Sequence, residues 1–96
     1  MAIYFLALEA RPGENSDDYG RVAGAYISCW IQCDAPSEAR AIAADDVEQE
    51  GWIVDSIEQE PKVLGSATPG TEERFEQAKI DGCCYVYHTW SKEARQ

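Results

Sequence analysis

Residues 26–33 read Tyr26-Ile27-Ser28-Cys29-Trp30-Ile31-Gln32-Cys33, a run with the apolar content and the alternation of a β-strand. Successive side chains of a strand point to opposite faces, so Ile27, Cys29 and Ile31 share one face while Tyr26 and Trp30 stand on the other. The small and aliphatic face suits packing against a helix. The aromatic face needs a partner or a ligand, because the chain has too few helices to cover it.

Three further strands and two helices are predicted around this strand. The helix over residues 36–50 is the clearest, since Pro36 suits a first helical turn, Gly51 ends the pattern and apolar residues recur at helical spacing between them. A shorter helix follows Thr71, with Phe75 and Ala78 on its inner side. The strands are expected at about residues 3–9, 21–33, 52–58 and 83–90, and the segments 10–20 and 59–70 are read as polar loops.

The predicted order is therefore ββαβαβ, in one domain of 96 residues. This set of elements fits an α+β two-layer sandwich, in which a four-stranded, largely antiparallel sheet carries both helices on one face. The order of the strands within the sheet stays open.

The first helix and the strand after it form a unit, with the residues Ser37-Glu38-Ala39-Arg40-Ala41-Ile42-Ala43 and then Gly51-Trp52-Ile53-Val54. This helix-then-Gly-Trp-strand unit resembles one found in small uncharacterised bacterial α+β domains of ferredoxin-like build. The resemblance implies a fold of that kind and assigns no functional residue. The chain departs from the βαββαβ order of those domains, because two strands precede its first helix.

Charge and composition limit the classes of partner. The formal charge of −10, from 18 acidic and 8 basic residues, opposes binding to nucleic acid and to anionic membranes, which both favour positive surfaces. The apolar run of residues 1–8 has no basic region ahead of it and is too short to cross a bilayer, so it is read as the first strand rather than a signal peptide. We expect a cytoplasmic bacterial protein with reduced thiols.

Cysteine and histidine could in principle build a metal site, since Cys29 and Cys33 share one strand face and Cys84 and His88 share another. Cys29 and Cys33 would lie about 13 Å apart at roughly 3.3 Å per residue, which is beyond the reach of one ion. We therefore expect four packed thiols, no metal and no cofactor. His88 is the only histidine and stands beside no recognisable nucleophile motif, so no catalytic residue is assigned.

Seven carboxylates and no base lie between Asp45 and Glu60. Those in the last turns of the first helix sit at the negative end of its dipole, where each costs about 0.3–1 kcal/mol. Three readings stay open: a solvated face, docking of a basic partner, and binding of a divalent cation. Asp46 alone falls on the apolar side of the helix, close enough to its end to reach solvent. The predicted docking residues are Asp45, Asp46, Glu48 and Glu50.

Aromatic residues of the sheet form the other candidate surface. Large exposed apolar patches on soluble domains usually mark interfaces, so we expect a homodimer. A protein or peptide partner, a small-molecule pocket and burial under loops stay open. Platforms for single-stranded nucleic acid also use aromatics on a sheet but add basic residues to them. The predicted interface residues are Tyr26 and Trp30 on the second strand and Tyr85 and Tyr87 on the last.

Two functions fit these observations. The first is an acidic, non-enzymatic interaction module that binds a basic partner, for example an inhibitor or immunity-like protein. The second is a small dimeric ferredoxin-like enzyme or ligand-binding protein, with an aromatic pocket lined by Trp30, Tyr85, Tyr87 and His88. The chain contains no Gly-rich phosphate loop, no Gly-x-Ser-x-Gly elbow, no paired histidines and no Cys-x-x-Cys, and this favours the first function.

Overall fold

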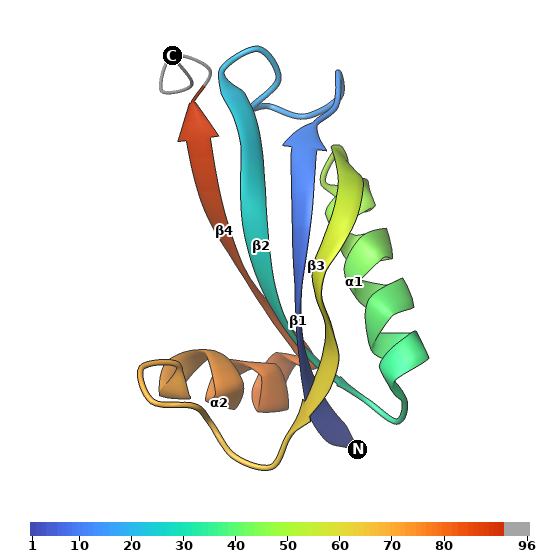
Figure 1. Cartoon of the computed structure of the whole chain (residues 1–96), viewed down its shortest axis with the longest axis vertical. Helices are drawn as coiled ribbons and strands as arrows, with labels where there is room; N and C mark the ends of the chain where they lie inside the picture. The colour runs from blue at the N-terminus through green and yellow to red at the C-terminus, as the bar shows by residue number, and fades with distance from the viewer. Residues whose placement is uncertain (92–96) are drawn as a thin grey trace.

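The computed structural model describes residues 1–91 and confirms the predicted order ββαβαβ and the α+β class (Figure 1). No helix in this range has the length and apolar character that crossing a membrane requires. The elements are β1 (Ala2–Pro12), β2 (Val22–Cys33), α1 (Pro36–Gln49), β3 (Trp52–Leu64), α2 (Glu72–Asp81) and β4 (Cys83–Ser91).

The four strands form one antiparallel sheet in the order β3-β1-β2-β4, so β3 and β4 are its two edges. Strand β3 is longer than predicted and continues through Pro61 to Leu64. Proline is tolerated there because an edge strand has one side without a hydrogen-bonded neighbour. The register between β1 and β3 also shifts at three places, which marks bulges in this edge.

Helix α1 covers one face of the sheet and closes the main core. Its buried residues Ala39, Ala43 and Val47 pack against Leu6 and Cys29, and all five are fully buried. After the helix, Gly51 adopts a φ of +89°, and a Cβ there would lie 2.9 Å from the backbone nitrogen of Ser16. Glycine therefore suits both the left-handed conformation and the close approach of the two loops at this helix stop, which the sequence predicted.

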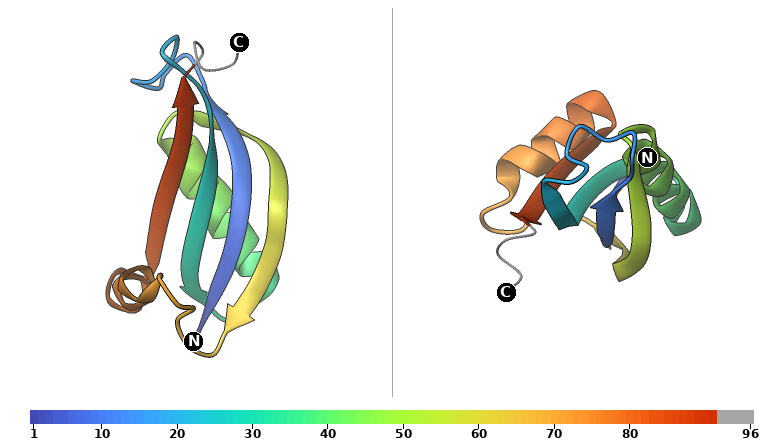
Figure 2. Two further views of the ribbon diagram at one scale, coloured as in Figure 1. Left: turned by 60° about the vertical axis from the view of Figure 1, so that its left-hand side comes forward. Right: turned by 90° about the horizontal axis from the view of Figure 1, so that it is seen from above.

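Helix α2 packs against the opposite face, so the expectation that both helices share one face is wrong. Phe75 and Ala78 of α2 belong to a second buried cluster with Trp30, whereas α1 packs on Cys29, the neighbour of Trp30 in β2. Adjacent residues of a strand point to opposite faces, which separates the two helices. Figure 2 shows the helices on opposite sides of the strands. The chain must cross the end of the sheet between its edges β3 and β4, and α2 is part of that crossing.

The second face is only partly covered. Helix α2 has 10 residues and is therefore about 15 Å long, whereas the 12 residues of β2 extend over about 40 Å. Contacts of α2 are made mainly with β4 and β2 and concentrate near one end of the sheet, as Figure 1 shows. A groove is left where α2 and the loop before it rise from the open part of this face.

Candidate functional site

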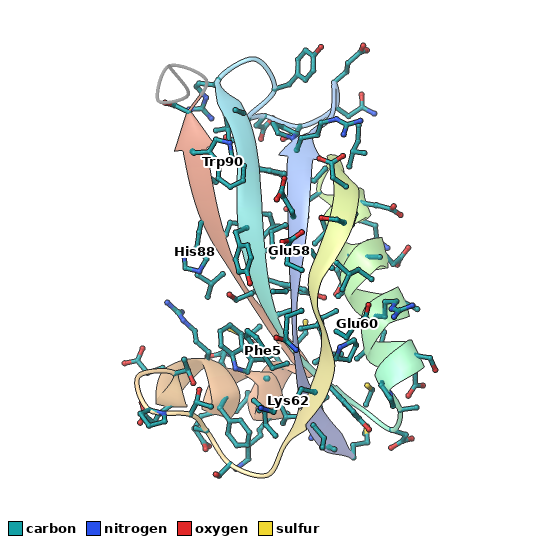
Figure 3. All side chains as sticks on the ribbon, viewed as in Figure 1. Phe5, Glu58, Glu60, Lys62, His88 and Trp90 are labelled. Atoms are coloured by element: carbon teal, nitrogen blue, oxygen red, sulfur yellow. The ribbon has the colours of Figure 1, made fainter. Side chains whose placement is uncertain are left out.

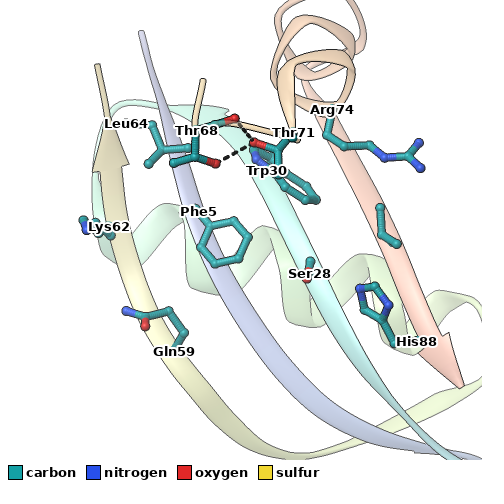
Figure 4. A pocket seen from close by; sticks show the side chains of 12 residues that line it. Phe5, Ser28, Trp30, Gln59, Lys62, Leu64, Thr68, Thr71, Arg74 and His88 are labelled. Atoms are coloured by element: carbon teal, nitrogen blue, oxygen red, sulfur yellow. Dashed lines mark hydrogen bonds between the residues drawn. The ribbon is translucent and has the colours of Figure 1, made fainter. Parts of the chain in front are cut away.

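The groove beside α2 has a volume of about 500 Å³ and receives side chains from all four strands and from α2 (Figure 4). Its apolar floor is formed by Phe5 of β1, Trp30 of β2 and Val86 of β4. The rings of Phe5 and Trp30 meet edge to face, with centroids 5.1 Å apart and an interplanar angle of 66°. This is a favourable geometry for an aromatic pair and fixes the two rings relative to each other.

Trp30 packs against residues of α2 and β1 in addition to Phe5. Only 4% of the residue is exposed, because Phe75, Ala78 and Ile3 belong to the same buried cluster. Its Nε1–H has no hydrogen-bond acceptor among residues 1–91. A buried donor without an acceptor costs about 1–3 kcal/mol. A tryptophan is therefore an unfavourable residue at a position that only needs to be filled.

The loop before α2 forms one wall of the groove. The hydroxyl groups of Thr68 and Thr71 lie 2.6 Å apart, and the Thr71 hydroxyl also lies 2.9 Å from the carbonyl oxygen of Thr68, to which it can donate. Thr71 was predicted to cap α2, but its side chain accepts no bond from the first turn of the helix. It stabilises the turn of the loop instead.

Three basic or titratable side chains line the groove: Lys62 from β3, Arg74 from α2 and His88 from β4. Figure 3 shows Phe5 and Lys62 near α2, with His88 further along β4. The imidazole of His88 is exposed and lies 6.4 Å, between ring centroids, from Tyr26. Ser28 and Gln59 complete the polar part of the lining.

The four predicted interface aromatics do not form one surface. Tyr26 and Trp30 lie on the α2 face, whereas Tyr85 and Tyr87 lie on the α1 face and pack against the main core. Trp30 is buried in the groove floor, and only Tyr26, at 39% exposure, is an exposed large aromatic of this set. The homodimer stays a prediction, but the single aromatic face on which it rested is not formed.

Of the pocket residues predicted for a ligand-binding protein, Trp30 and His88 line the groove and the two tyrosines do not. Lys62, Arg74 and Phe5 were missed. Lys62 fell in a segment read as a loop because of Pro61, and Arg74 looked like one of several charged residues on an exposed helix. No local pattern connects these two residues, because the fold brings them to the groove from different elements.

The position of Asp46 near the end of the helix suggested that its carboxylate would reach solvent. In the structure the residue is half-buried instead. Its carboxylate accepts a hydrogen bond from the hydroxyl of Tyr85, and both residues are half-buried. Burial and then the bond to Asp46 raise the pKa of Tyr85 well above its ordinary value. The neighbouring Tyr87 packs edge to face on Trp52 at 5.3 Å, and burial raises its pKa to about 12. Asp46 thus belongs to the packing between α1 and β4.

The other three predicted docking residues, Asp45, Glu48 and Glu50, are exposed at the C-terminal end of α1. We call these three residues the α1 acidic end. Asp45 accepts a hydrogen bond from the Gln49 amide at 2.8 Å, and no basic residue stands in the last turn of the helix.

All four cysteines are free thiols. Cys29 is fully buried, and burial raises its pKa to about 12, which keeps the thiol protonated and unreactive. Cys29, Cys33 and Cys83 lie on the α1 face or its rim, whereas Cys84 packs on the α2 face. Among residues 1–91 no three histidine, cysteine or acidic side chains are grouped as metal ligands.

No known protein family matches the chain, and neither a curated protein nor a solved structure is significantly similar to it. The ferredoxin-like resemblance therefore stays a prediction.

The bond between Tyr85 and Asp46 predicts different effects for two neighbouring carboxylates. Asp46→Ala should lower the free energy of unfolding by about 1–2 kcal/mol, because the half-buried Tyr85 hydroxyl loses its acceptor. Asp45→Ala should leave it within about 0.5 kcal/mol of the wild type, since Asp45 is exposed. Urea unfolding measures both, and Tyr85→Phe completes a double-mutant cycle with Asp46→Ala. Equal effects of the two alanine variants, or an additive cycle, would contradict the bond.

The raised pKa of Tyr85 also predicts loss of stability at high pH. The folded chain keeps this proton at pH values where the unfolded chain releases it, so the contribution is complete below about pH 10 and declines as pH rises further. One such group changes the free energy of unfolding by at most about 1.4 kcal/mol per pH unit. Urea unfolding between pH 9 and 11 should show a shallower decline for Tyr85→Phe than for the wild type. Tyr26→Phe, at an exposed position, is the control and should decline like the wild type.

Proposed function

We propose that this chain is a non-enzymatic binding module that holds a small organic molecule in the groove beside α2. The observation that carries this proposal is the aromatic floor of Phe5 and Trp30, which is rigidly packed from below and bordered by polar side chains above. Sites for small molecules are typically concave, mostly apolar, and supplied with a few polar groups that orient the ligand. A volume of about 500 Å³ falls within the usual range of about 300–1,000 Å³ for such sites.

Binding is favoured over catalysis by the surroundings of His88, because histidine is the residue of this lining that most often serves as a general acid or base. A catalytic histidine is normally oriented by a hydrogen bond from a second group, often a carboxylate. In residues 1–91 the His88 side chain makes a ring contact with Tyr26 and no hydrogen bond with another side chain. The residues that are held firmly are the apolar ones of the floor, and these supply contact area rather than chemistry.

A pair of planar probes tests this function: naphthalene-2-sulfonamide, which is neutral, and naphthalene-2-sulfonate, which is its charged counterpart. At least one of them should shift the NMR signals of Phe5, Val86 and the Trp30 indole N–H, with little change at residues of the α1 face. Gln59→Trp should abolish these shifts, because it places a large ring in the groove lining. Ser56→Trp is the matched control, since Ser56 is an exposed neutral residue of the same strand outside the groove. Binding of neither probe, or equal binding to both variants, would contradict the proposal.

The α1 acidic end supports a second candidate function, the docking of a basic partner. Its three carboxylates pair with no basic residue in the described part of the chain, whereas Asp55 and Glu60 of β3 pair with Arg11 and Arg40. They also lie at the negative end of the α1 dipole, where they destabilise the helix. Acids that cost stability and remain unpaired are available to a partner of opposite charge.

For this second candidate, the triple variant Asp45→Asn, Glu48→Gln, Glu50→Gln should be as stable as the wild type or more stable. Its binding to a lysine-rich peptide should weaken and become less sensitive to salt, because salt screens attraction between opposite charges. A variant with three other exposed acids neutralised (Glu14→Gln, Asp17→Asn and Glu73→Gln) controls for net charge. Calorimetric titration compares the three proteins. Equal peptide binding by both triple variants, or a loss of more than about 1 kcal/mol in urea unfolding of the first, would exclude this surface.

A further inference from the structure

The basic residues of this chain divide into two groups. Every lysine and arginine of residues 1–91 that lies outside the groove pairs with a carboxylate: Arg11 with Asp55, Arg21 with Asp18, Arg40 with Glu60, and Lys79 with Glu76. Lys62 and Arg74 line the groove, and neither has an ion-pair partner in the same range. In a chain with 18 acidic and 8 basic residues, a base without an acidic partner is the exception.

The groove lining also excludes negative charge. None of its 12 residues is Asp or Glu, although the chain carries a net charge of −10. Glu72, which follows Thr71 in the wall, accepts a hydrogen bond from the backbone of Gly70 and is not part of the lining. Figure 4 shows Lys62 and Arg74 on opposite sides of the groove, with the ring of Phe5 between them. The groove is therefore a locally positive site in a negative protein.

One further feature of the site favours an acceptor group on the ligand. The first turn of α2, which follows Thr71 and contains Arg74, has no side-chain cap for its backbone N–H groups. Such donors, together with a guanidinium and an ammonium group, match the oxygens of a carboxylate, sulfonate or phosphate.

We infer that the ligand of the groove is an organic anion: a planar apolar body with one carboxylate, sulfonate or phosphate group. This inference rests on the proposed function and gives its ligand class. The planar body lies against Phe5 in the groove, the anionic group is bound by Arg74 on one side, and Lys62 adds a second positive charge on the other side. At physiological ionic strength charges are screened over about 8 Å, so the two bases of the lining act on the ligand more strongly than carboxylates that lie farther away than this.

The matched naphthalene probes test the charge of the ligand separately from its shape. The wild type should bind naphthalene-2-sulfonate about tenfold more tightly than naphthalene-2-sulfonamide, which is a modest value for hydrogen bonds to an ionised group. In the double variant Lys62→Gln, Arg74→Gln this ratio should fall to about one, while the affinity for the sulfonamide stays the same. The double variant Arg40→Gln, Lys79→Gln removes two bases outside the groove and should keep the wild-type ratio. Calorimetric titration gives the affinities, and urea unfolding verifies that each variant is folded.

Each outcome has one meaning. Equal binding of the two probes by the wild type would overturn the inference about charge and leave the proposed function intact. A sulfonate preference that survives in the Lys62→Gln, Arg74→Gln variant would also overturn it, because the anion would then be bound elsewhere. Binding of neither probe would remove the proposed function and the inference together.

Discussion

The register between β1 and β2 is the constraint on which the rest of this structure depends. Nine residue pairs, from Ala2 with Cys33 to Ala10 with Ala25, fix it without interruption. It places Leu6 beside Cys29 on the face that α1 covers, and Phe5 beside Trp30 on the face that α2 covers. A slip of one residue would move the aliphatic set of β2 to the opposite face, so burial of the main core and formation of the groove floor are set by the same pairing.

The two faces of the sheet are used differently because the two helices differ in length and position. Helix α1 has 14 residues, packs mainly against β3 and β2, and closes a core whose central side chains are inaccessible to solvent. Helix α2 has 10 residues and lies across one end of the other face. The first face holds most of the buried apolar residues, and the partly covered second face leaves the groove beside α2 open. The main core and the proposed binding site therefore lie on opposite sides of one sheet.

Acidic and basic residues are also distributed unevenly over the molecule. Acidic residues gather at the end of α1 and along β3, where some are neutralised by arginine and the α1 acidic end is not. Next to Lys62 and Arg74, in contrast, the lining contains no carboxylate. A net charge of −10 describes the molecule at long range but does not predict which ligand a single groove accepts, since screening limits each charge to its surroundings.

The sequence by itself determined the elements, their order and the two faces of β2, because alternation, helical spacing, the helix start at Pro36 and the helix stop at Gly51 are local properties of the chain. It also showed that Trp30 needs a cover. Only the tertiary structure decided that α2 provides this cover, since the apolar side of Phe75 and Ala78 could pack on either face until the edge positions of β3 and β4 were known. The phase of β4 was undecided for a similar reason: both of its faces are apolar, so the side taken by Tyr85 and Tyr87 depends on pairing with β2. Lys62 and Arg74 border the same groove only because of that arrangement, since no sequence pattern connects an edge strand with the helix that follows it after a loop.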